Sequence, residues 1–315
     1  MTKISVDGEA TKTSPGIGWR ILDFAVLATR HRGASKKRWS AYPLVIPSIV
    51  LIAILAVGLA YLIWTSFQSG DTTSNVQGGL SLDQYRNLFT GPSASVYRDT
   101  LLRTSIYALI VTVTAVCLAI PTAYAIVSIK RRLWRRIAML LLLVPFLMGE
   151  TVRAIGWVLI IGKDGVLSWV GRIFGFQIEL LGSPFAIWLG MVQVMFPLAT
   201  LVMMPAIRGI SPNLEWAALT MGARPWQVWL RIIVPLARPG ILGASLVVAT
   251  LSMTEYLMPR ILGLGKLPFA ATTIQQLFFS RGNINLGSAL SAVLLVFVIS
   301  MVVIIVFLGK ERSRS

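Results

Sequence analysis

The sequence predicts an all-α, polytopic membrane protein, and three observations lead to this class. Of the 315 residues, 56% are hydrophobic and only 13% are charged, and the mean hydropathy is +0.76. A soluble domain of this size does not need so much apolar surface. Six apolar runs are each long enough to cross about 30 Å of hydrocarbon, which takes about 20 helical residues. The net charge of +17 is then better explained by membrane topology than by nucleic-acid binding.

The six apolar runs are the predicted membrane spans. They lie near residues 43–67, 103–129, 137–161, 184–207, 227–257 and 287–308. The fifth run begins with an amphipathic approach, so we expect its true span to be shorter. Prolines in or near these runs are expected to kink the helices, with neighbouring helices satisfying the freed backbone groups. Kinks that let the bundle rock and kinks that only pack are both open interpretations.

The Lys and Arg residues predict the orientation of the chain. With Arg153 inside a span, twenty of them fall on the side of the two termini and eight on the opposite side. Basic residues are retained on the cytoplasmic side of membrane proteins. We therefore expect both termini in the cytoplasm.

Outside the spans the sequence predicts tails and short helices. Residues 1–40 are a basic cytoplasmic segment, either disordered or a helix lying on the membrane. Residues 41–309 form the membrane domain and 310–315 a cytoplasmic tail. On the outer side we expect short helices from about Ser81 and from Val166 to Phe174.

The segment between the fourth and fifth spans predicts a short, stiff helix at about 212–221. Ser211 is a good N-cap and Pro212 suits the first helical position. Glu215 falls in the first turn, where the helix dipole favours an acid. Gly222 supplies the stop, which leaves about ten residues and a length of about 15 Å.

One face of this predicted helix is apolar and small. Leu214, Ala217, Ala218 and Met221 recur at helical spacing. The two alanines allow another surface to approach closely. We therefore expect this face to be a docking surface.

Charged residues within the spans point to function, because they are costly in a membrane. Glu150 and Arg153 are three residues apart on one helix face and close enough to pair. They are either an internal ion pair or part of a transport pathway. Glu255 and Tyr256, near the outer end of the fifth span, could offer a carboxylate and a cation–π face to a cationic solute. The other interpretation of Glu255 is an acid at a helix end.

Known catalytic motifs are missing from the sequence. There is no P-loop and no zinc-protease motif, so we expect no enzyme, no catalytic residue, no cofactor in this chain and no metal site. Cys117 lies inside an apolar run and is interpreted as a packing residue. If the protein uses ATP, a partner must bind it.

The 212–221 region resembles the cytoplasmic loop of inner-membrane permeases of binding-protein-dependent ABC importers. That family has Glu-Ala-Ala, three residues, Gly, nine residues and Ile-x-Leu-Pro. The matching residues are Ala217, Ala218, Gly222, Ile232, Val234 and Pro235. Val234 replaces Leu, and Trp216 stands where the family has Glu, with Glu215 one place early. The resemblance implies that the helix docks an ATPase through Leu214, Glu215, Ala217, Ala218, Met221 and Gly222.

Three further stretches resemble spermidine/putrescine-type permeases, in particular the first of their two permease subunits. They are LLLVPFLMGETVRAIGWVLIIGKDGVLS, TEYLMPRILG and NINLGSALSAVLLV. This resemblance implies a six-helix core paired with a sister permease, two ATPase subunits that bind ATP and Mg²⁺, and a periplasmic solute-binding protein. A polyamine is the expected solute. The alternatives are an amino-acid derivative, opine, phosphonate or iron on the same fold, or a stand-alone secondary transporter.

Overall fold

The computed structural model describes residues 42–69, 79–176 and 179–311. The predictions for residues 1–40 and for most of the 310–315 tail lie outside this part of the chain. The chain divides into two units, residues 1–58 and 59–315, and the core and the sites described below belong to the second unit. Its helices and those of the first unit have the following bounds: α2 Tyr42–Ser66, α3 Asp83–Thr90, α4 Ala94–Ser128, α5 Arg132–Leu147, α6 Glu150–Ile161, α7 Val166–Ile173, α8 Pro184–Arg208, α9 Pro212–Thr220, α10 Pro225–Val228, π-helix η2 Trp229–Ile233, α11 Val234–Leu236, α12 Arg238–Thr254, α13 Leu257–Leu262, α14 Ala270–Gln275, π-helix η3 Gln276–Ser280 and α15 Ile284–Glu311.

The described residues confirm the predicted all-α membrane class. By length and composition, five helical stretches of the described chain could cross a membrane, and six if the bent pair α10–α12 counts as one span. One of the five, Glu150–Ile173, combines α6 and α7. The pair bends by 67° between Leu236 and Arg238. The bend follows the π-helical turn η2 and Pro235, which has no N–H to donate into a regular helix. The predicted amphipathic approach to the fifth span is therefore a separate arm.

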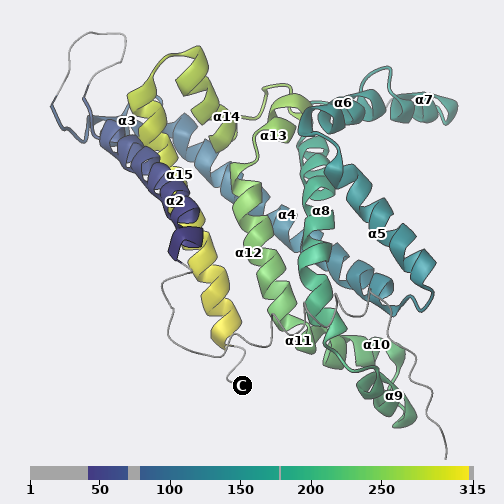
Figure 1. Ribbon diagram of the computed structural model, residues 1–315. Helices are drawn as coiled ribbons and strands as arrows, with labels where there is room; N and C mark the ends of the chain where they lie inside the picture. The colour runs from purple at the N-terminus through teal and green to yellow at the C-terminus, as the bar shows by residue number, and fades with distance from the viewer. Residues whose placement is uncertain (1–41, 70–78, 177–178, 312–315) are drawn as a thin grey trace, which may run out of the picture. The chain divides into compact units, whose positions relative to one another are not determined.

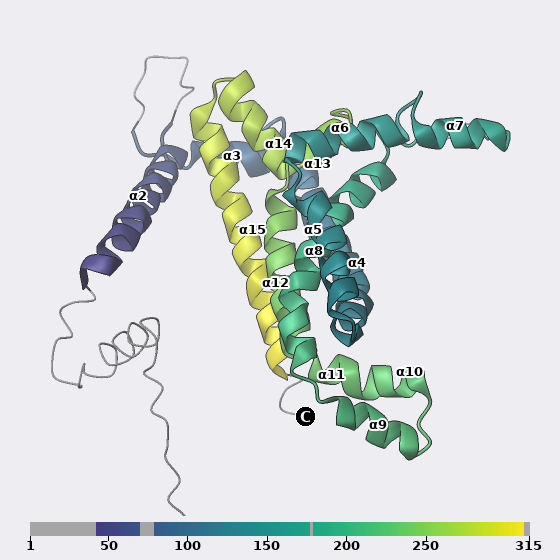
Figure 2. The same ribbon diagram turned by 45° about the vertical axis from the view of Figure 1, so that its right-hand side comes forward.

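The third predicted span, 137–161, is interrupted. Helix α5 ends at Leu147, Met148 and Gly149 are extended, and α6 starts at Glu150. In Figures 1 and 2, α6 and α7 run crosswise over the end of the bundle that lies opposite α9. Hydropathy did not reveal the break because the sequence stays apolar through it. The short helices predicted near Ser81 and Val166 are confirmed as α3 and α7.

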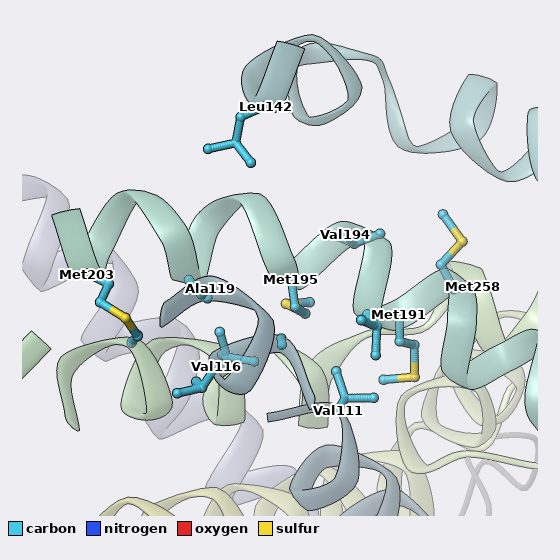
Figure 3. Packing of buried hydrophobic residues seen from close by; sticks show 14 of the residues in the cluster. Val111, Val116, Ala119, Leu142, Met191, Val194, Met195, Met203 and Met258 are labelled. Atoms are coloured by element: carbon cyan, nitrogen blue, oxygen red, sulfur yellow. The ribbon is translucent and has the colours of Figure 1, made fainter. Parts of the chain in front are cut away.

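The core of the unit lies between α4, α8 and α12. Figure 3 shows valines and Ala119 of α4 against the methionines of α8, with Leu142 of α5 and Met258 of α13 at the margin. Helix α8 begins at a true cap, because the Ser183 hydroxyl accepts a hydrogen bond from the Ala186 N–H at 3.1 Å. The small and flexible side chains of the core between α4, α8 and α12 let these helix backbones approach closely.

The basic segments gather at one end of this bundle. The C-terminal end of α4, the start of α5, the arm α9–α10 and the C-terminal end of α15 share the lower end in Figures 1 and 2. Helices α3, α6, α7 and α14 lie at the other end. This arrangement agrees with the predicted division of Lys and Arg between two sides.

Gly240 lies where α12 approaches α8 closely, and we expect Gly240→Ala to destabilise the bundle. An added Cβ would lie 2.5 Å from the Ala206 Cβ, a contact that forces the two helices apart at a cost of about 1–3 kcal/mol. Gly243→Ala is the matched control, because its nearest neighbour, Val202 Cγ1, lies at 3.6 Å. The free energy of unfolding in detergent–SDS mixtures measures both. Equal stability of the two variants would contradict the expectation.

Candidate functional site

Helix α9 starts at Pro212 as predicted, but its cap differs from the prediction. Ser211 has the extended conformation of an N-cap, with φ −68° and ψ 127°, yet its hydroxyl caps nothing. Its carbonyl instead accepts a hydrogen bond from the Leu214 N–H at 3.1 Å. Pro212 has no N–H of its own, so the start of α9 depends on the fixed φ of Pro212 and on Glu215 in the first turn.

Gly222 ends this segment as the sequence predicts. Its φ of +85° lies in the left-handed region that favours glycine. The N–H of Gly222 donates to the Leu219 carbonyl at 3.0 Å, and the N–H of Ala223 donates to the Ala218 carbonyl at 3.1 Å. Since nothing lies within 4 Å of an added Cβ, the backbone conformation and not the space demands glycine.

The predicted apolar face of α9 is divided between the inside and the outside of the molecule. Ala218 is buried and packs with Val228 of α10 and Ile233 of η2. Leu214, Ala217 and Met221 are exposed, and Met221 is 81% exposed. We call these last three residues the apolar stripe of α9. An exposed apolar surface of this kind is a typical protein interaction site.

Glu215 points to the inside of the molecule and not to the apolar stripe. The Tyr124 hydroxyl of α4 donates a hydrogen bond of 2.6 Å to its carboxylate oxygen Oε1. Trp216, at the position of the family glutamate, is 66% exposed. The residue one place early is thus held by the bundle, and the tryptophan at the expected place is free at the surface.

The three charged residues expected within the spans come together at one end of the bundle, though without the predicted ion pair. Glu150 is exposed in the first turn of α6, where the helix dipole favours it. Arg153 is buried and donates from Nη1 to the Pro145 carbonyl at 3.2 Å. That carbonyl lies in the last turn of α5, where carbonyl groups have no helical N–H from which to accept a hydrogen bond.

Glu255 joins this group from the end of α12. It is half-buried, its Oε1 accepts a hydrogen bond from the Met258 N–H at 3.4 Å, and the charges of both Glu150 and Arg153 act on its carboxyl. Helix α13, which follows Glu255, packs against α6. The group therefore holds two carboxylates and one guanidinium that is already bound to a carbonyl.

Tyr256 does not belong to this charged group. Its side chain lines an apolar pocket of about 540 Å³ between α12, α14, η3 and α15. The Tyr256 ring, which the sequence predicts to offer a cation–π face beside Glu255, therefore lines this apolar pocket instead. A polar pair that the sequence did not indicate joins α6 to α8, where the Trp157 Nε1 donates to the Gln193 Oε1 at 3.4 Å.

The structure also adds Tyr124, which the sequence analysis missed. Tyr124 lies within an apolar span, and its partner Glu215 is 91 residues away. A tyrosine near the end of a span is a common interfacial feature, so the sequence carried no specific signal. In the described part of the chain, no cluster of three or more His, Cys, Asp or Glu side chains could hold a metal.

Comparison with known proteins agrees with this geometry. Residues 115–310, more than half of the chain, match the family described as binding-protein-dependent transport system inner membrane component. The chain is 25% identical to the spermidine/putrescine transport system permease protein PotB of Haemophilus influenzae, over 88% of this chain and 92% of the relative. It is 27% identical to PotB of Escherichia coli K12, over 74% and 84%.

Solved structures share the fold. A bacterial ABC transporter involved in the import of the acidic polysaccharide alginate aligns with a TM-score of 0.68 at 16% identity, over 93% of this chain and 98% of that chain. A bacterial alginate ABC transporter in complex with an alginate pentasaccharide-bound periplasmic protein aligns with a TM-score of 0.67 at 15% identity, over 94% of this chain and 98% of that chain. The chain is thus a multi-pass transport protein of known fold, and it belongs to the family of binding-protein-dependent transport system inner membrane components.

Proposed function

We propose that this chain is the transmembrane subunit of a bacterial ABC importer, driven through α9 by ATP hydrolysis on a separate subunit. The single observation that carries the proposal is the apolar stripe of α9, whose residues are exposed although α9 itself is fixed to the bundle. The stripe lies at the basic end of the unit, which we assign to the cytoplasm together with both termini.

The proposed mechanism needs a stiff element between the ATPase and the bundle. The sequence holds no P-loop, so the energy must enter through contacts that differ between two states of the bundle. Helix α9 begins at a proline, and two residues after its last residue comes Gly222 with a left-handed backbone. A helix bounded in this way moves as one body, which a flexible loop of the same length does not.

The family and the fold support a proposal for the partners of this chain. We propose a sister permease, two ATPase subunits and a periplasmic solute-binding protein. The family is described as an inner membrane component of binding-protein-dependent transport systems, the relatives are named as permease proteins, and one solved structure with this fold includes an alginate-bound periplasmic protein. ATP and Mg²⁺ are assigned to the ATPase subunits.

For the solute we propose a di- or polycation such as putrescine or spermidine. Two observations support this choice: the relatives are named as spermidine/putrescine permeases, and the charged group of Glu150, Arg153 and Glu255 carries more carboxylates than guanidinium groups. The fold alone does not select a solute, since the structures that share it import an acidic polysaccharide.

Site-specific cross-linking tests the assignment of α9. Cys117 is the only cysteine of the chain, so Cys117→Ser gives a background in which Met221→Cys is the sole thiol. We expect a thiol-to-amine reagent to join position 221 to the ATPase subunit in native membranes. Ser280→Cys is the control and should give no such product, because Ser280 is exposed and ends η3, which directly follows α14 at the opposite end of the bundle from α9. An ATPase adduct at 280, or none at 221, would contradict the proposal.

A further inference from the structure

The contact between Tyr124 and Glu215 ties α9 to a helix that is not adjacent to it in the chain. Helix α9 is connected covalently to α8 through residues 209–211 and to α12 through α10, η2 and α11. Helix α4 has no such connection, because Tyr124 and Glu215 are 91 residues apart. Motion of α9 can reach α8 and α12 along the chain, but it can reach α4 only through side-chain contacts.

The Tyr124–Glu215 bond is suited to carry that motion. At 2.6 Å it has the length of a hydroxyl bound to an ionised oxygen, which is shorter, stronger and more directional than an apolar contact. Apolar surfaces can slide along one another, because burial has no preferred direction. The bond instead fixes the register between α9 and the cytoplasmic end of α4.

The surroundings hold both partners in place while leaving room for movement. The Tyr124 ring packs edge-on against the Trp229 ring of η2, with centroids 5.9 Å apart. It also contacts the small core of Ala218, Val228 and Ile233. Beside the bond lies a cavity of about 410 Å³, which Lys130 and Trp216 also line. Empty space next to a directional bond allows the two helices to shift without a clash.

We propose that Tyr124 and Glu215 are positioning residues that transmit the displacement of α9 to α4 when the ATPase closes. This inference rests on the proposed function and changes one assignment within it. Glu215 acts on the inside of the permease, and the contact with the ATPase is made by the apolar stripe and Trp216. Because α4 packs against α8 and α12, a shift of α4 reaches the whole core.

The natural thiol of α4 allows a test that does not depend on the solute. Cys117, which the sequence analysis interprets as a packing residue, is exposed in this chain and precedes Tyr124 by about two helical turns. In the assembled complex in native membranes, we expect ATP with vanadate to change the rate at which a permeable maleimide modifies the Cys117 peptide, by about fivefold as for a typical allosteric coupling. Tyr124→Phe keeps the ring against Trp229 but removes the hydroxyl, and it should abolish this ATP-dependent change.

A double-mutant cycle separates transmission from packing. Glu215→Ala should abolish the ATP-dependent change in Cys117 modification, as Tyr124→Phe does. The double variant should show no larger loss than either single variant. Glu215→Gln keeps a hydrogen-bond acceptor and should retain part of the ATP-dependent change. Tyr107→Phe is the matched control: Tyr107 is another half-buried tyrosine of α4, and it donates to the Pro184 carbonyl at 3.4 Å. It should leave the ATP-dependent change intact.

The outcomes distinguish this inference from the proposed function. A wild-type chain that recovers no ATPase would defeat the proposed function. If the ATPase is bound but Cys117 does not respond to ATP in the wild type, or responds normally in Tyr124→Phe, the link is refuted. Equal losses in Tyr124→Phe and Tyr107→Phe would also refute it, since the effect would then be general weakening of α4.

Discussion

Replacing Ala217 by tryptophan is expected to abolish ATP-driven uptake while leaving the chain folded and inserted. Ala217 is exposed between Leu214 and Met221 on the apolar stripe, so its replacement by an indole removes no contact inside the molecule. It stands instead where the ATPase must approach. Disruption at the centre of an interface costs about 2 kcal/mol or more, which is about 30-fold in affinity. Recovery of the ATPase with the permease and uptake into vesicles measure the effect.

The same substitution elsewhere controls for the bulk of tryptophan. Ala125 is an exposed alanine of α4, and Ala125→Trp should insert normally and keep the ATPase bound. Ala218→Trp would be uninformative, because Ala218 is buried and its replacement disturbs the fold of α9 itself. Normal uptake and normal stimulated ATP hydrolysis in Ala217→Trp would remove α9 from the mechanism.

The helix α9 could be predicted closely because its limits are local. Proline fixes the backbone at its start and Gly222 adopts the left-handed conformation at its end, and both effects act within a few residues. Which residues of α9 are buried and which are exposed could not be predicted in this way. The spacing places Leu214, Ala217, Ala218 and Met221 on one face, but it does not indicate that Ala218 is the only one of these four that is buried.

The spans show the same division between local and distant causes. Hydropathy found the apolar segments, since burial in lipid requires about 20 apolar residues in a row. It missed the interruption at Met148 and Gly149, where the backbone turns while the composition stays apolar. The third span therefore becomes two helices with different directions.

The arrangement of the charged group could not be predicted, because it depends on tertiary contacts that one sequence does not reveal. The spacing of Glu150 and Arg153 favours an ion pair, but Arg153 turns back to the Pro145 carbonyl across the break between α5 and α6. Without that break the carbonyl would be occupied within a continuous helix. The convergence with Glu255 arises because α13 packs against α6, a contact between segments about 100 residues apart.

Glu255 is the carboxylate of this group that we expect to matter most for a cationic solute. It is half-buried, whereas Glu150 is exposed, and charge–charge attraction grows as water is excluded. The guanidinium of Arg153 is held by the Pro145 carbonyl, so it does not neutralise Glu255 through a direct ion pair. The Glu255 carboxylate is thus available to an incoming ammonium group.

Glu255→Gln should therefore reduce uptake of putrescine and spermidine by about tenfold or more. The substitution keeps the shape of the side chain and removes one charge, and two opposite charges at 4 Å attract by about 4 kcal/mol at an effective dielectric constant of 20, part of which hydration offsets. Glu179→Gln is the control, because Glu179 forms an exposed ion pair with Lys163 at 3.2 Å and such pairs contribute little. Concentration-dependent uptake of each polyamine gives the affinity and the rate. If both stay at wild-type values in Glu255→Gln, the charge of Glu255 takes no part in recognition, and the assignment of a cationic solute loses its support from this group.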